Sequence, residues 1–104
     1  MERLKRGIYA TAMNAHIMSA YEEIENEDLA ESILTDWFMV GVPDGNNLVD
    51  NIVDFGDKDS YDELLNDYIA LCKRCQICFN FSKEIEEIEK NIVEMLDNPY
   101  YNVI

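Results

Sequence analysis

Apolar positions recur at the spacing of an α-helix through most of the chain. Roughly residues 3–25 are predicted to form a first long helix with one apolar face, made of Leu4, Ile8, Met13, Ile17, Tyr21 and Ile24. Gly7 weakens the start of this helix, whereas its four alanines favour helix and allow close packing. The pattern therefore predicts a helix that buries one side against a core.

A second helix is predicted to follow Asn26, whose side chain can cap it. Glu27 and Asp28 occupy the first turn, where carboxylates interact favourably with the helix dipole. The helix has a broad apolar stripe, made of Leu29, Ala30, Ile33, Leu34, Trp37 and Phe38. Residues 41–47 contain two glycines and a proline, so we expect the helix to end in a loop there. The pattern leaves open whether Asn26 divides one long helix into two.

Three further helices follow from the same spacing. A short one over 47–55 is predicted from its apolar pairs, with a strand as the alternative because valine and isoleucine favour β-structure. Residues 60–63 have the sequence of a capping box, so a third long helix should begin at Ser60, with a stripe made of Leu64, Tyr68, Leu71, Cys72, Cys75, Cys78 and Phe79. A break near 80–82 is expected, with a bent continuous helix as the alternative. A last helix capped by Ser82 should then present Ile85, Ile88, Ile92, Met95 and Leu96.

These elements predict one all-α domain over 1–104, a compact bundle of four main helices plus one short helix. Pro99 should stop the last helix. Residues 98–104 then form an apolar tail that either packs back on the domain or remains a flexible docking strip. The chain has no run of about 18 apolar residues, and its basic start is not followed by a continuous apolar region. We therefore expect neither a membrane span nor a signal peptide.

Charge is distributed unevenly along the chain. There are 22 acidic residues against 8 Lys and Arg, which gives a net charge of −14. Residues 1–6 carry three of the cations, whereas residues 7–57 carry eleven acids and no Lys or Arg. A field of this sign repels phosphates, so direct binding to nucleic acid or to an anionic membrane is disfavoured. Either the charge only keeps the protein soluble, or it attracts a strongly basic partner.

Three clustered cysteines form the only motif-like constellation. Cys72, Cys75 and Cys78 make two CxxC units that could supply thiolates to zinc or to an iron–sulfur cluster, but a fourth ligand would have to come from His16 or a carboxylate. The same spacing places all three on the apolar stripe of the predicted helix, and free cysteine is among the most buried residue types. We therefore expect core packing, with no metal and no cofactor. An odd, tight cluster also indicates a reduced, cytoplasmic protein.

No other pattern points to catalysis. His16 is the only histidine, and neither a nucleophile elbow nor an HExxH motif accompanies it. The acidic segment that begins at Asp57 fails as a calcium loop, because Tyr61 and Asp62 stand where an oxygen ligand and a glycine are needed. Pairs of carboxylates arise by chance in so acidic a chain. We expect a protein that is not an enzyme.

The acids within residues 22–57 are the candidate partner-binding residues. The set consists of Glu22, Glu23, Glu25, Glu27, Asp28, Glu31, Asp36, Asp44, Asp50, Asp54 and Asp57. DNA carries one negative charge per ~1.7 Å of its axis, and a rigid helical array of carboxylates can imitate that spacing. Such an array could occupy a basic nucleic-acid-binding groove, with association that depends on salt. Tyr21, Trp37 and Tyr61 could add aromatic anchors, although Trp37 also suits the core.

Segment 22–57 and the overall composition resemble the small, acidic, mainly helical inhibitors made by phages and mobile elements, including antirestriction DNA mimics and anti-CRISPR proteins. Nuclease immunity proteins are similar in that an acidic protein binds a basic target. The resemblance implies a protein that inhibits a basic nucleic-acid-binding protein, such as a nuclease or a restriction or CRISPR effector, by electrostatic and steric occlusion. The basic residues within 73–90 favour a one-sided acidic patch. The alternatives are an immunity protein for a toxin and a general interaction or scaffold module, such as a homodimer joined through the apolar tail.

Overall fold

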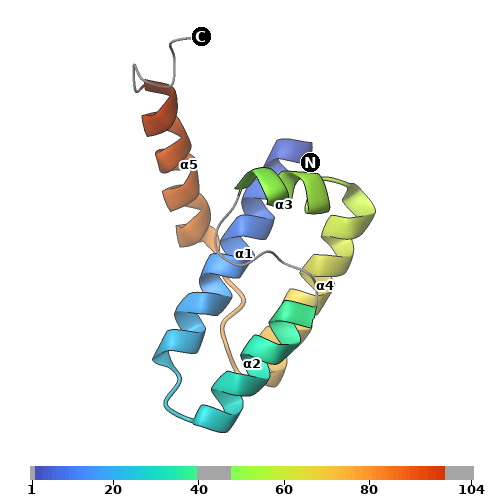
Figure 1. Ribbon diagram of the computed structural model, residues 1–104, viewed down its shortest axis with the longest axis vertical. Helices are drawn as coiled ribbons and strands as arrows, with labels where there is room; N and C mark the ends of the chain where they lie inside the picture. The colour runs from blue at the N-terminus through green and yellow to red at the C-terminus, as the bar shows by residue number, and fades with distance from the viewer. Residues whose placement is uncertain (1, 40–47, 98–104) are drawn as a thin grey trace.

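The computed structural model describes residues 2–39 and 48–97, which form five helices and no strand (Figure 1). The helices are α1 (Arg3–Glu23), α2 (Glu27–Met39), α3 (Leu48–Phe55), α4 (Lys58–Arg74) and α5 (Ser82–Asp97). The all-α prediction is therefore confirmed, and the short segment before Gly56 is a helix rather than a strand. The predicted loop over 41–47 and the tail over 98–104 lie outside the described residues. None of the described helices is long and apolar enough to cross a membrane.

Helix α1 is the centre of the fold, because it contacts each of the other four helices. Residues 10–14 are all buried, so the middle of α1 is covered on every side rather than along one stripe. Small side chains at Ala10 and Ala12 allow this close packing. Leu4 was predicted to lie on the buried apolar face of this helix. That prediction was wrong, because Leu4 is 47% exposed.

The core is filled mainly by α1, α2 and α4. Its largest fully buried side chains include Met13 and Ile17 from α1, Trp37 from α2, and Tyr68 from α4. Helix α5 contacts α1 and no other helix in the described part of the chain. The segment that leads into α5 places Phe81 edge-on against Tyr68, with ring centroids 5.4 Å apart. Aromatic packing of this kind anchors the last helix to the core.

Buried and partly buried polar side chains join α1 to α2 and to α4. The Trp37 indole Nε1 donates to Asn14 Oδ1 at 2.8 Å, which links α2 to α1. The Tyr68 hydroxyl and His16 Nδ1 lie 2.5 Å apart and link α4 to α1. Each bond satisfies a group that would be costly to bury alone. These bonds give each neighbouring helix a specific register on α1.

The short helix α3 crosses α1 at very close range. A Cβ on Gly7 would overlap Ile52 Cγ1 and lie 2.9 Å from Ile52 Cα, so only glycine fits. Asn51 Nδ2 donates to Thr11 Oγ1 at 2.8 Å, and that hydroxyl donates to the Gly7 carbonyl at 2.8 Å. An isolated helix of eight residues is unstable in water. These contacts with α1 therefore hold α3 in place.

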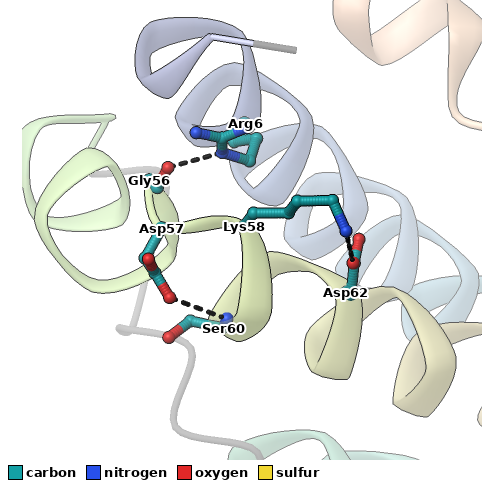
Figure 2. Close-up of polar contacts among 6 residues, drawn as sticks. All are labelled: Arg6, Gly56, Asp57, Lys58, Ser60 and Asp62. Carbon is teal, nitrogen blue, oxygen red and sulfur yellow. Dashed lines mark hydrogen bonds and ion pairs between the residues drawn. The ribbon is translucent and has the colours of Figure 1, made fainter.

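The junction between α3 and α4 is tied to the start of α1 (Figure 2). Arg6 Nε donates to the Gly56 carbonyl at 2.5 Å, which places a cation at the C-terminal end of α3. Asp57 Oδ2 accepts from the Ser60 backbone N–H at 3.3 Å and is the N-cap of α4. The prediction that α4 begins at Ser60 was wrong because Asp57, three residues earlier, takes the capping position.

The remaining caps follow the prediction only in part. Asn26 Oδ1 accepts from the Leu29 backbone N–H at 3.1 Å, which confirms Asn26 as the cap of α2 and ends α1 before it. The prediction of Ser82 as a cap was wrong. Ser82 is the first residue of α5, and its backbone N–H donates to Asn80 Oδ1 at 3.0 Å.

Helix α4 ends at Arg74, and seven residues separate it from the start of α5. Gln76 has φ 58°, and two backbone bonds close the end: Ile77 N–H to Cys72 O at 2.8 Å and Gln76 N–H to Lys73 O at 3.3 Å. This is the Schellman arrangement, which satisfies the last carbonyls of the helix. The prediction that the α4 stripe continues through Cys78 and Phe79 was therefore wrong.

Candidate acidic interface

Six of the eleven candidate residues gather where α1 ends and α2 begins. All six are exposed, and we call them the junction acids: Glu22, Glu23, Glu25, Glu27, Asp28 and Glu31. Glu27 and Asp28 stand in the first turn of α2, where the helix dipole stabilises a carboxylate. Glu22 and Glu23 stand in the last turn of α1, where the dipole disfavours one by about 0.3–1 kcal/mol. The last turn of α1 has no basic residue. The junction thus tolerates a local cost in stability to display negative charge.

The junction acids border an open cavity of about 530 Å³. Its lining consists of Tyr21, Glu22, Ile24, Glu27, Ala30, Glu31 and Leu34. Three carboxylates therefore surround a hollow that also has aliphatic and aromatic surface. Such a lining suits a long cationic side chain, because the aliphatic stem can lie on apolar atoms while the charged head meets the carboxylates. Tyr21 adds a ring that can face a cation.

Asp36, on the next turns of α2, is not part of this open surface. It forms an ion pair with Arg74 at the end of α4, and Arg74 Nη2 also donates to Ser32 Oγ at 3.3 Å. The Asp36 carboxylate raises the pKa of Arg74. The Arg74 side chain is 54% exposed and the Asp36 side chain is 37% exposed, so solvent screens the pair. Arg74 marks one edge of the acidic surface.

Three more candidate residues lie at the other end of α1. Asp50, Asp54 and Asp57 are exposed, on α3 and at the start of α4. Figure 1 shows α3 beside the N-terminal end of α1 and the α1–α2 connection at its C-terminal end. The 21 residues of α1 separate these ends by about 30 Å. The structure therefore divides the candidate set in two, and Asp44 lies outside the described residues.

The two acidic groups differ in their surroundings. The N-terminal cations Arg3, Lys5 and Arg6 lie in the first turns of α1, at the α3 end. At the junction end, Arg74 is the cation that contacts α2, and it is engaged with Asp36. The junction acids are therefore the less neutralised group and the better candidate site.

Two of the three suggested aromatic anchors are in the core. Trp37 is fully buried against Tyr68, and Tyr61 is buried beside Tyr9. Burial raises the pKa of Tyr61 to about 12. Tyr21 alone lines the acidic cavity. Tyr21, Ile24 and Leu34 belong to the predicted apolar stripes, but they line one cavity together because of how α1 and α2 pack, which local spacing does not show.

The three cysteines differ in burial. Cys72 and Cys75 are buried, as predicted, whereas Cys78 is exposed because α4 ends before it. Burial raises the pKa of Cys72 to about 11, although its hydrogen bond with Tyr68 acts in the opposite direction. The raised pKa disfavours the reactive thiolate. Cys75, Cys78 and His16 line a second cavity of about 440 Å³. No group of three His, Cys, Asp or Glu side chains within the described residues is placed to hold a metal ion.

Comparison of the chain with protein-family models, with curated proteins and with solved structures finds no match.

Proposed function

We propose that this chain is a non-enzymatic inhibitor that binds a basic, nucleic-acid-binding protein through the junction acids and occludes its nucleic-acid site. The target class is a nuclease or a defence complex such as a restriction or CRISPR effector. The observation that carries the proposal is the cavity at the α1–α2 junction, where Glu22, Glu27 and Glu31 surround apolar and aromatic surface. The scaffold is a compact bundle of four main helices plus one short helix, working in the reducing cytoplasm.

Charge at the junction supports this function in two ways. Six acids within residues 22–31 create a field that steers a basic partner towards the junction and raises the association rate. The cavity then supplies what charge alone does not, because a buried anchor contributes more affinity than rim charges do. A lysine or arginine of the target would enter between the three glutamates, with its stem on Ile24 and Leu34. Phosphates compete for the same cation, which makes the inhibition competitive with nucleic acid.

A pair of matched variants tests the proposal. The first replaces Glu22, Glu27 and Glu31 by glutamine, and the control replaces Glu86, Glu87 and Glu89 on α5, which are exposed. Both remove three negative charges, so they change the net charge equally. The target is first isolated from a lysate of the source organism with the tagged wild-type chain, and its affinity for each variant is then measured by calorimetry.

We expect the junction variant to bind about tenfold to a hundredfold more weakly, at roughly 0.5–1 kcal/mol per exposed charge pair. The α5 variant should bind within about threefold of the wild type, since only the long-range field changes. Equal affinity of the two variants would remove the junction from the interface. If the protein isolated from the lysate with the tagged chain does not bind nucleic acid, the occlusion mechanism is contradicted.

A further inference from the structure

Exposed apolar side chains gather at the α3 end of the molecule. Among the described residues, four large hydrophobic side chains are exposed: Leu4 (47%), Val49 (69%), Val53 (69%) and Phe79 (49%). Three of the four belong to α3 and the first turn of α1. Scattered exposed hydrophobics need no explanation, but a group at one place indicates an interaction surface.

The three side chains belong to two elements that pack together, the first turn of α1 and α3. Val49 and Val53 are one turn apart on α3, so they are neighbours on its surface. The opposite face of α3 carries Asn51 and Phe55, which are buried against the rest of the protein. Leu4 stands one turn before Gly7, on the face of α1 that α3 crosses. We call Leu4, Val49 and Val53 the α3-end surface.

This surface is held rigidly. The close approach at Gly7 and the Asn51–Thr11 bond fix α3 on α1. The Arg6–Gly56 bond, shown in Figure 2, adds a third contact. A partner that docks on a preorganised surface loses less conformational entropy than one that docks on a mobile segment. The polar contacts between α3 and α1 thus hold the two exposed valines in fixed positions.

The charges around the α3-end surface have both signs. Asp50 and Asp54 flank the valines and are exposed, and Arg3 and Lys5 are exposed in the first turn of α1. Arg3 lies against Gly56, where a Cβ would overlap its side chain. A surface that carries both acids and cations suits a symmetric contact, because the acids of one copy can face the cations of the other.

We propose that the α3-end surface joins two copies of this chain in a weak, symmetric dimer. A net charge of −14 makes two copies repel almost everywhere. At the α3 end the cations Arg3, Lys5 and Arg6 partly offset the nearby acids, and this end lies about 30 Å along α1 from the junction acids, well beyond the Debye length of about 8 Å. The contact leaves both acidic junctions free, so the dimer does not depend on the proposed inhibition.

The size of the surface sets the strength of the dimer. Two valines and a leucine, with the rim charges, form a contact smaller than the roughly 800 Å² per partner of a stable complex. Dimerisation is therefore expected with a dissociation constant on the order of 0.1 mM, as in transient contacts. The dimer should be populated only in concentrated samples.

Sedimentation of the full chain from about 10 µM to about 1 mM, a range that brackets this constant, tests the proposal. The mean mass should rise from 12.1 kDa towards twice that value. In a variant with Val49→Ser and Val53→Ser the mass should stay at the monomer value throughout. Serine and valine have similar helix propensity, so α3 should survive, and circular dichroism checks that it does. The matched control is Phe79→Ser, which should dimerise as the wild type does.

Three results would overturn the proposal. The first is a monomer mass at every concentration. The second is a dimer that persists in the Val49→Ser and Val53→Ser variant, which would place the contact on another surface. The third is a dimer lost only in Phe79→Ser, which would assign the contact to the segment between α4 and α5.

Discussion

Replacing Gly7 by alanine tests how α3 is held, because two simple rules predict opposite signs for its effect. Helix propensity alone says that alanine inside a helix stabilises it by about 1 kcal/mol relative to glycine. The packing says the reverse, since the new Cβ would lie 2.9 Å from Ile52 Cα and overlap Ile52 Cγ1. Because one of the obstructing atoms, Ile52 Cα, belongs to the backbone, a side-chain rotation cannot relieve the clash and the two helices must separate.

The magnitude follows from what separation disrupts. Overpacking of this kind costs about 1–3 kcal/mol. Separation also strains the bond from Asn51 Nδ2 to Thr11 Oγ1, and an unsatisfied buried amide costs about 1–3 kcal/mol. After subtracting the propensity gain, we expect Gly7→Ala to lower the free energy of unfolding by about 1–5 kcal/mol, with a central value of about 3 kcal/mol.

Urea unfolding followed by circular dichroism measures the effect. A loss of that size lowers the midpoint by about 2 M, with m near 1–1.5 kcal/mol/M for a chain of this length. Ser19→Ala provides the control, because Ser19 is exposed on the same helix and its replacement should stabilise slightly. Gly7→Ala that raises the midpoint would refute the close approach of α1 and α3.

Three further predictions concern the core and its titrating groups. Asn14→Ala should lower the free energy of unfolding by about 1–3 kcal/mol in a urea titration, because it leaves the buried Trp37 indole N–H without the Asn14 acceptor. Burial raises the pKa of Tyr61 from 10.0 to about 12, so stability should be complete below pH 10 and fall as pH rises from 10 through 12, with the tyrosinate absorbance appearing late. An aromatic disulfide reagent should label the exposed Cys78 quickly and Cys72 only on unfolding, and fast labelling of both would contradict the burial of α4.

Helices were predictable from the chain because apolar spacing is a local property, and all five appear close to where it placed them. The cap at Asn26 was predictable for the same reason. The end of α4 was not, because Gln76 takes the left-handed conformation that a glycine would normally signal. The error on Cys78 and Phe79 followed directly from that missing signal.

Long-range packing decided the rest. The short side chains of Gly7, Ala10 and Ala12 allow α1 to be surrounded, yet no local pattern shows which helices surround it. The junction acids were predictable as a group because they are close together in the sequence. The separate position of Asp50 and Asp54 was not, since it depends on α3 crossing the far end of α1. The interface role of all these acids stays a prediction.

The central claim is that the junction acids displace nucleic acid from a basic target. The most direct measurement titrates the chain into a complex of the isolated target with a labelled oligonucleotide and follows fluorescence anisotropy at low and high salt. We predict full displacement at low salt, weaker displacement at high salt, and strongly reduced displacement by the variant lacking charge at Glu22, Glu27 and Glu31. An oligonucleotide that stays bound while the chain binds the same target would contradict occlusion.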